Sequence, residues 1–106
     1  FENISSEIYM LKKLEKIAEE LERRMIKSNT KGKTITLKIK YSDFTQQTRS
    51  KTKTNFMQTK KEFFPIVKEL LYQDKLINSV RLLGLSFGNL NTEKKEPVWV
   101  QLKFEF

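Results

Sequence analysis

The residues of this 106-residue chain best suited to chemistry are cations, hydroxyl groups and glycines, most of which alternate with apolar residues. Alternation with a period of two predicts strands, and it turns this polar set away from the core. The set comprises Thr36, Lys38, Lys40, Gln47, Arg49, Lys51, Gly84, Ser86 and Gly88. Cations neutralise phosphates, hydroxyl groups donate to phosphate oxygens, and glycine lets another backbone approach. The mixture predicts contact with a sugar-phosphate backbone, and the lack of interleaved aromatic residues argues against base stacking.

The charge balance points the same way. The chain has 21 Lys and Arg against 13 Asp and Glu, a formal net charge of +8. Such an excess favours nucleic acid or an anionic membrane surface as a partner. For Lys38 or Lys40 taken alone, a solvated side chain is the better explanation. The run Thr48–Thr52 together with the stripe of Gly84, Ser86 and Gly88 favours phosphate contact.

Several kinds of catalysis are excluded by composition. There is no Cys and no His, which removes disulfides, thiolate chemistry, histidine acid–base chemistry and the commonest zinc sites. The acidic residues fall on predicted helix faces and turns, without the carboxylate cluster that two-metal chemistry needs. We therefore expect no catalytic residue, no metal ligand and no cofactor in this chain.

Periodicity predicts the elements that position the polar set. Apolar residues at spacings of three and four predict a helix over about residues 6–27, with Ser5 as its N-cap. Thr59 and Glu62 form a capping box that opens a second helix, in which Pro65 predicts a kink or a shifted start. Alternating segments predict strands over 34–41, 80–90 and 98–106. A further strand, unusually polar, is expected over about 44–53, after a tight turn at Ser42 and Asp43. The expected fold is α+β: one domain, residues 1–106, a two-layer sandwich with two helices on one face of a four-stranded antiparallel sheet and an open basic face for DNA.

Three segments, in this order, resemble a known family: Gly32–Phe44, Thr48–Thr52 and Val80–Leu85. They are similar to the C-terminal domain, or little finger, of Y-family translesion DNA polymerases, above all the bacterial polymerase IV group of the DinB type. The resemblance implies a four-stranded sheet under two helices that grips duplex DNA through its backbone. It also implies that the first strand of the family precedes the long helix, and only Phe1 to Asn3 correspond to it here. We therefore expect residues 98–106 to pair with a vacant sheet edge, in the same molecule or in a neighbouring one.

The resemblance implies DNA-backbone contact by specific residues. These are Arg49, Ser50, Lys51, Thr52 and Arg81, with Lys38 and Lys40 as weaker contacts. Gln47, Thr48, Gly84 and Ser86 join them from the predicted sheet face. Leu82 and Ser86 stand where some relatives carry Arg, which implies weaker contact there.

The last six residues, 101–106, resemble the peptide by which bacterial polymerases of this group dock on the sliding clamp. An extended peptide would place Gln101 in a polar subsite and Leu102, Phe104 and Phe106 in an apolar cleft. An ordinary strand with three inward apolar residues explains the same pattern.

Two functions remain open. The first is a DNA-binding and clamp-docking part of a cytoplasmic, nucleoid-associated bacterial polymerase, acting on primer–template duplex DNA in translesion synthesis and repair. Its catalytic palm domain and Mg²⁺ would belong to the rest of the polymerase chain, and the start at Phe1 without Met favours such a fragment. The second is a free-standing α/β module that binds RNA or protein. A membrane-surface module is a weaker third, because the cations are expected on strands.

Overall fold

The computed structural model describes residues 7–73, 76, 79–91 and 98–103, and the side chains of all of these except 7, 102 and 103. The elements are α1 (Glu7–Lys27), β1 (Gly32–Tyr41), β2 (Gln46–Met57), α2 (Lys60–Tyr72), β3 (Val80–Leu90) and β4 (Val98–Lys103). The predicted order and type of every element are confirmed. The N-cap assigned to Ser5 lies outside the described residues.

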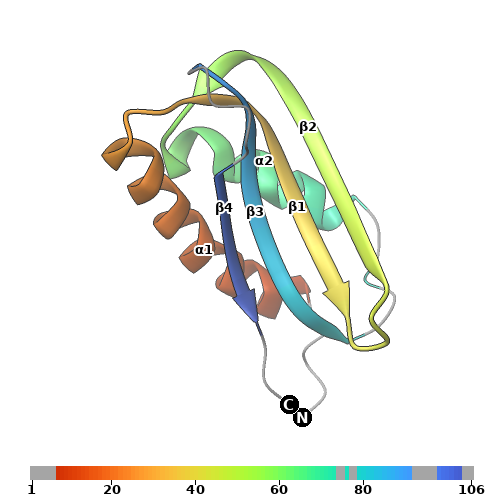
Figure 1. Ribbon diagram of the computed structural model, residues 1–106. Helices are drawn as coiled ribbons and strands as arrows, with labels where there is room; N and C mark the ends of the chain where they lie inside the picture. Colours follow the sequence, from red (N-terminus) through yellow and green to blue (C-terminus); the bar gives the residue numbers. More distant parts are fainter. Residues whose placement is uncertain (1–6, 74–75, 77–78, 92–97, 104–106) are drawn as a thin grey trace.

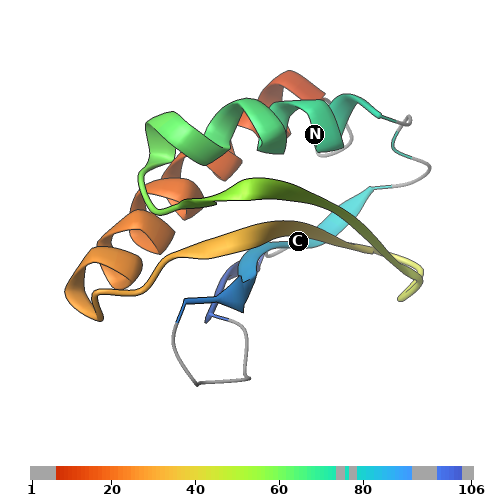
Figure 2. The ribbon, with the colours of Figure 1, turned by 90° about the horizontal axis from the view of Figure 1, so that it is seen from above.

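The four strands form one antiparallel sheet with the order β2-β1-β3-β4. Both helices cover the same side of it, α1 across the β3–β4 half and α2 nearer β1 and β2 (Figure 1). Figure 2 looks along the sheet and shows the two layers, with the opposite sheet face covered by neither α1 nor α2. The α+β two-layer prediction is therefore confirmed.

The core fills the space between the layers. Strands β1 and β3 contribute the alternating residues expected of them: Ile35, Leu37, Ile39, Tyr41, Leu83, Leu85 and Phe87, all fully buried. The ring of Phe63 from α2 meets the ring of Phe87 from β3 edge to face, with centroids 5.1 Å apart. On α1 the spacing predicts a buried stripe of Ile8, Leu11, Leu14, Ala18, Leu21 and Met25, and the last four are buried. Met10 and Ile17 are buried as well, whereas Ile8 is 68% exposed.

Helix α2 begins where its capping box predicts. Thr59 is the N-cap, and the carboxylate of Glu62 accepts the backbone amides of Gln58 and Thr59 at 2.9 and 3.0 Å. These two donors, Thr59 first, lower the pKa of Glu62 below its ordinary value of 4.5. Pro65 lies inside the helix, and the start is not shifted.

Strand β2 has the opposite phase to the one expected. Leu37 pairs with Arg49, Ile39 with Gln47 and Ile35 with Lys51, and directly paired residues share a face. Gln47, Arg49 and Lys51 therefore lie on the helix side of the sheet, so the prediction that they line the open face is wrong. The strand is polar throughout, and apolar alternation gave no signal of its phase.

Arg49 is buried, at 5% exposure, beneath the end of α2. Its guanidinium donates to the carbonyl oxygens of Leu70 and Leu71, both at 2.9 Å, and to the Gln47 amide oxygen at 3.1 Å. The Tyr41 hydroxyl donates to that same amide oxygen at 2.8 Å. The last carbonyls of a helix have no partner within the helix and carry partial negative charge, so a cation stabilises them.

The Val98–Lys103 part of the final segment pairs with β3 in the same molecule, as the edge-pairing hypothesis allowed. On α1, Arg24 donates to the carbonyl oxygen of Trp99 at 2.9 Å. The helix thus holds the backbone of the edge strand β4.

Replacing Arg49 tests its structural role. Arg49→Met removes the guanidinium from the buried Leu70 and Leu71 carbonyls, although the Leu70 carbonyl still accepts the Gln73 amide at 3.4 Å. It should lower the free energy of unfolding by roughly 2–4 kcal/mol. Urea denaturation monitored by circular dichroism measures this. Arg23→Met removes an exposed cation of α1 and should change stability by less than about 0.5 kcal/mol. Equal stability of the two variants would contradict the role given to Arg49.

The capping box predicts a pH dependence. Because the folded pKa of Glu62 is depressed, its contribution is complete at neutral pH and is lost as the pH falls through that pKa, below 4.5. Glu62→Ala should destabilise the protein by about 1 kcal/mol at pH 7, with the difference from wild type shrinking in acid. For Glu62→Gln, the difference from wild type should also narrow in acid, since the amide does not titrate. Thermal denaturation between pH 3 and 7 checks both, and a difference constant with pH would refute the assignment.

Candidate nucleic-acid interface

The open sheet face is built from rows of residues that the register places side by side. One row runs Thr48–Lys38–Gly84–Gln101, the next Ser50–Thr36–Ser86–Trp99, and a third starts Gln46–Lys40–Leu82. On β1 the expected residues Thr36, Lys38 and Lys40 are confirmed on this face. On β2 the face consists of Gln46, Thr48, Ser50 and Thr52 in place of the cations expected there.

Short hydroxyl residues and the two β1 lysines therefore lie side by side across the β1–β2 pair. Thr48, Ser50 and Thr52 are exposed, and Lys38 and Lys40 are half-buried beside them. The hydroxyls of Thr34 and Thr52 are 2.7 Å apart, and the Asn89 amide donates to Thr34 at 2.6 Å. Thr48 and Ser50 have no such hydrogen bond to another described residue. Their hydroxyl groups can donate to an outside acceptor on the same face as Lys38 and Lys40.

The glycine stripe of β3 is covered. Gly84 is buried and Ser86 is 3% exposed, although both lie on the open face as expected. An added β-carbon at Gly84 would stand 3.2 Å from the Gln101 side chain and 3.6 Å from the Trp99 ring. The side chains of β4 therefore fold over β3, and Gly84 and Ser86 are poorly placed for phosphate contact.

Trp99 supplies an aromatic ring that the prediction left out of this face. The ammonium group of Lys38 lies 5.5 Å from the centre of its ring. Alternation along β4 predicts that Trp99 faces away from the core. Its proximity to a β1 lysine two strands away, however, depends on the order of the strands in the sheet. The expectation that no aromatic residue interleaves with the cations is wrong.

Arg81 lies at the end of the face, beside the β1–β2 turn. The register shifts between Lys40, which pairs with Leu82, and Tyr41, which pairs with Val80, leaving Arg81 at the irregularity. Its guanidinium is 4.8 Å from the centre of the Phe44 ring, and the Lys40 ammonium is 5.8 Å from it. Arg81 thus joins Lys40 near the hairpin end.

Lys51, expected on the open face, contacts α2 instead. It forms an ion pair with the carboxylate of Glu69, and this hydrogen bond, together with the charge, lowers the pKa of Glu69 below its ordinary value of 4.5. The pair joins the edge strand β2 to the helix layer. Arg49 and Lys51 are therefore tied to α2.

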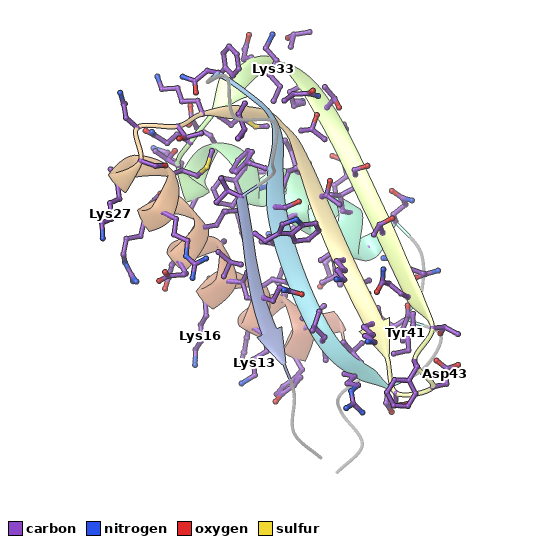
Figure 3. All side chains as sticks on the ribbon, in the orientation of Figure 1. Lys13, Lys16, Lys27, Lys33, Tyr41 and Asp43 are labelled. Carbon is purple, nitrogen blue, oxygen red and sulfur yellow. The ribbon has the colours of Figure 1, made fainter. Side chains whose placement is uncertain are left out.

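Other cations lie away from this face. Figure 3 labels Lys13, Lys16 and Lys27 along the outer side of α1, and Lys33 at the end of the β1–β2 hairpin opposite Asp43. On the outward side of α2, the residues Lys60, Lys61, Phe64, Pro65 and Lys68 line a shallow hollow of about 630 Å³. Lys60 is held there by the carboxylates of Glu15 and Glu19 at 3.6 and 3.1 Å.

The described ranges offer neither a metal site nor a membrane-spanning helix. They contain no group of three or more acidic side chains that could hold a metal ion. Neither α1 nor α2 is long and apolar enough to cross a membrane.

The segment proposed to dock on a clamp is only partly described. Gln101 is exposed on β4, and Leu102 pairs with Leu83 of β3. Phe104 and Phe106 lie outside the described residues. The first three residues of the segment are thus strand residues of the sheet.

Comparison with known proteins identifies relatives over most of the chain. One is the DNA polymerase IV of Akkermansia muciniphila, 34% identical over 105 residues, covering 98% of this chain. Those of Bacteroides fragilis and Clostridium perfringens are each 40% identical, covering 85% and 91% of it. The chain spans only 29%, 26% and 27% of the lengths of these three proteins.

The family model described as the impB/mucB/samB family C-terminal domain matches residues 1–103. This match and the identities confirm the resemblance to the DinB-type polymerases. The chain belongs to the impB/mucB/samB family and forms its C-terminal domain.

Proposed function

We propose that this chain grips duplex DNA through the phosphate backbone, with the β1–β2 part of the open sheet face. The observation that carries the proposal is the register: Lys38 pairs with Thr48, Thr36 with Ser50 and Lys40 with Gln46. The two lysines of β1 therefore lie beside the hydroxyl and amide side chains of β2, on a surface that neither α1 nor α2 covers. Such an array suits phosphate oxygens at any sequence, since phosphate contacts position a protein without reading bases.

The relatives extend the proposal to the whole polymerase. They are named DNA polymerase IV, and the matched region is a minor part of each. We infer that the parent of this chain is a DNA polymerase of the translesion type. Catalysis and its Mg²⁺ ions would then belong to another part of that protein, and this domain would hold the primer–template duplex in the bacterial cytoplasm.

Backbone gripping without base reading fits a polymerase that copies damaged templates. A lesion alters a base and leaves its phosphates in place. Contacts to phosphates therefore keep their strength when the template base changes.

The contacts proposed are Lys38, Lys40, Thr48, Ser50 and Thr52, with Arg81 at the hairpin end. Arg49 and Lys51 are left out because they are bonded to α2. Trp99 is included in the proposed surface because the Lys38 ammonium lies above its ring.

Salt-dependent binding tests the proposal. The double variant Lys38→Ala/Lys40→Ala should weaken binding to duplex DNA and reduce the slope of log K against log salt by about two. Lys61→Ala/Lys68→Ala changes the net charge equally on the far layer, and should affect the slope much less. Fluorescence anisotropy over a range of salt concentrations measures both. Equal losses in the two variants would show that net charge alone drives binding, and tighter, sequence-selective binding to single-stranded RNA would favour an RNA-binding module.

The second part of the proposal is docking of residues 101–106 on a sliding clamp. Its support is the residue pattern and the exposure of Gln101. Because Gln101 and Leu102 pair with β3, an extended docked peptide requires these residues to separate from the sheet. Docking would therefore compete with the end of β4.

Alanine substitutions test the docking. Phe104→Ala/Phe106→Ala should abolish capture of the chain by an immobilised bacterial sliding clamp, since two of the three apolar anchors are removed. Phe56→Ala removes a phenylalanine that is 41% exposed on β2, and should leave capture unchanged. Undiminished capture of the double variant would refute the docking role.

A further inference from the structure

The turn between β1 and β2 holds a bulky residue where the backbone favours glycine. Phe44 donates its amide to Tyr41, and Tyr41 donates to Thr45, each at 2.9 Å. These bonds close a three-residue hairpin loop whose last residue takes the left-handed conformation, and Phe44 has φ of 69°. The other non-glycine residues with positive φ in the described chain are Asn29 and Asn89, a type that tolerates it.

Packing in the core does not explain this phenylalanine. Its side chain is 64% exposed at the end of the hairpin, where Figure 3 labels Tyr41 and Asp43. The carboxylate of Asp43 accepts hydrogen bonds from the amide of Thr45 at 3.0 Å and from the hydroxyl of Thr45 at 2.6 Å, so the Asp43 side chain points toward the turn. Backbone strain at an exposed aromatic residue points to a function of the ring.

Two cations flank that ring. The Arg81 guanidinium lies 4.8 Å and the Lys40 ammonium 5.8 Å from its centre. An aromatic ring for a base with cations for the neighbouring phosphates is the combination by which proteins hold single-stranded nucleic acid. Lys40 also belongs to the open sheet face, so the ring stands at the end of the surface proposed for the duplex.

We propose that Phe44 stacks on an unpaired base where the duplex held by the open sheet face passes into single strand. Inside a duplex both faces of each base are covered by its neighbours, so only an unpaired or terminal base offers a face to the ring. Arg81 and Lys40, which lie over the ring in the unbound chain, move to the phosphates of that nucleotide and leave a face of the ring to the base. This inference rests on the proposed duplex binding.

A pair of DNA ligands with equal charge tests it. Both carry the same duplex and the same short single-stranded extension, made of ordinary nucleotides in one and abasic nucleotides in the other. The 106-residue chain should bind the first about tenfold more tightly, the worth of one base–aromatic stack. Phe44→Gly and Phe44→Asn should lose this preference, keep the affinity for the abasic ligand, and melt at or above the wild-type temperature, because both residues suit positive φ. Phe44→Trp should keep the preference.

The outcomes separate this inference from the duplex proposal. Equal wild-type affinity for the two ligands, or a preference unchanged in Phe44→Gly, overturns the stacking role and leaves duplex binding intact. A lower melting temperature with equal losses on both ligands assigns the ring to folding and also overturns it. Failure of the wild type to bind either ligand overturns the duplex proposal itself.

Discussion

The hydrogen bonds from Arg49 to the last carbonyls of α2 are the contact on which the open face depends. They bury a guanidinium between β2 and the helix layer, where a cation needs such acceptors to leave water. Because side chains alternate along a strand, placing Arg49 on the helix side places Thr48 and Ser50 on the other. The outward hydroxyl array is thus a consequence of one inward cation.

Much of the fold was predictable from the sequence. Three patterns identified elements, boundaries and core residues: alternation in β1 and β3, spacing in α2, and the Thr59–Glu62 capping box. They did so because the positions of the apolar residues indicate which face of an element is buried. In β2 the same method failed, since nearly every residue is polar and either phase looks plausible. The partners of Arg49 are backbone carbonyls, which every residue type possesses, so no sequence pattern reveals them.

The kind of candidate site was predictable from the sequence, but the residues that form it were predicted less well. Lys38 and Lys40 were placed correctly, whereas Gly84 and Ser86 lie beneath Trp99 and Gln101 from the neighbouring strand. The topology of the sheet decides which strands are neighbours. Coverage of a residue by an adjacent strand can therefore be predicted only when the topology is known. The φ of Phe44 is similarly a property of the closed turn.

The bond from Arg24 to the Trp99 carbonyl also affects how the molecule meets copies of itself. β4 ends the sheet, and unpaired backbone groups on an edge strand are a template for another strand and so for aggregation. Arg24 occupies one of these acceptors with a charged side chain. A foreign strand would have to displace Arg24 and bring its own backbone against a cation, so the contact that holds β4 also opposes pairing of this edge with another molecule.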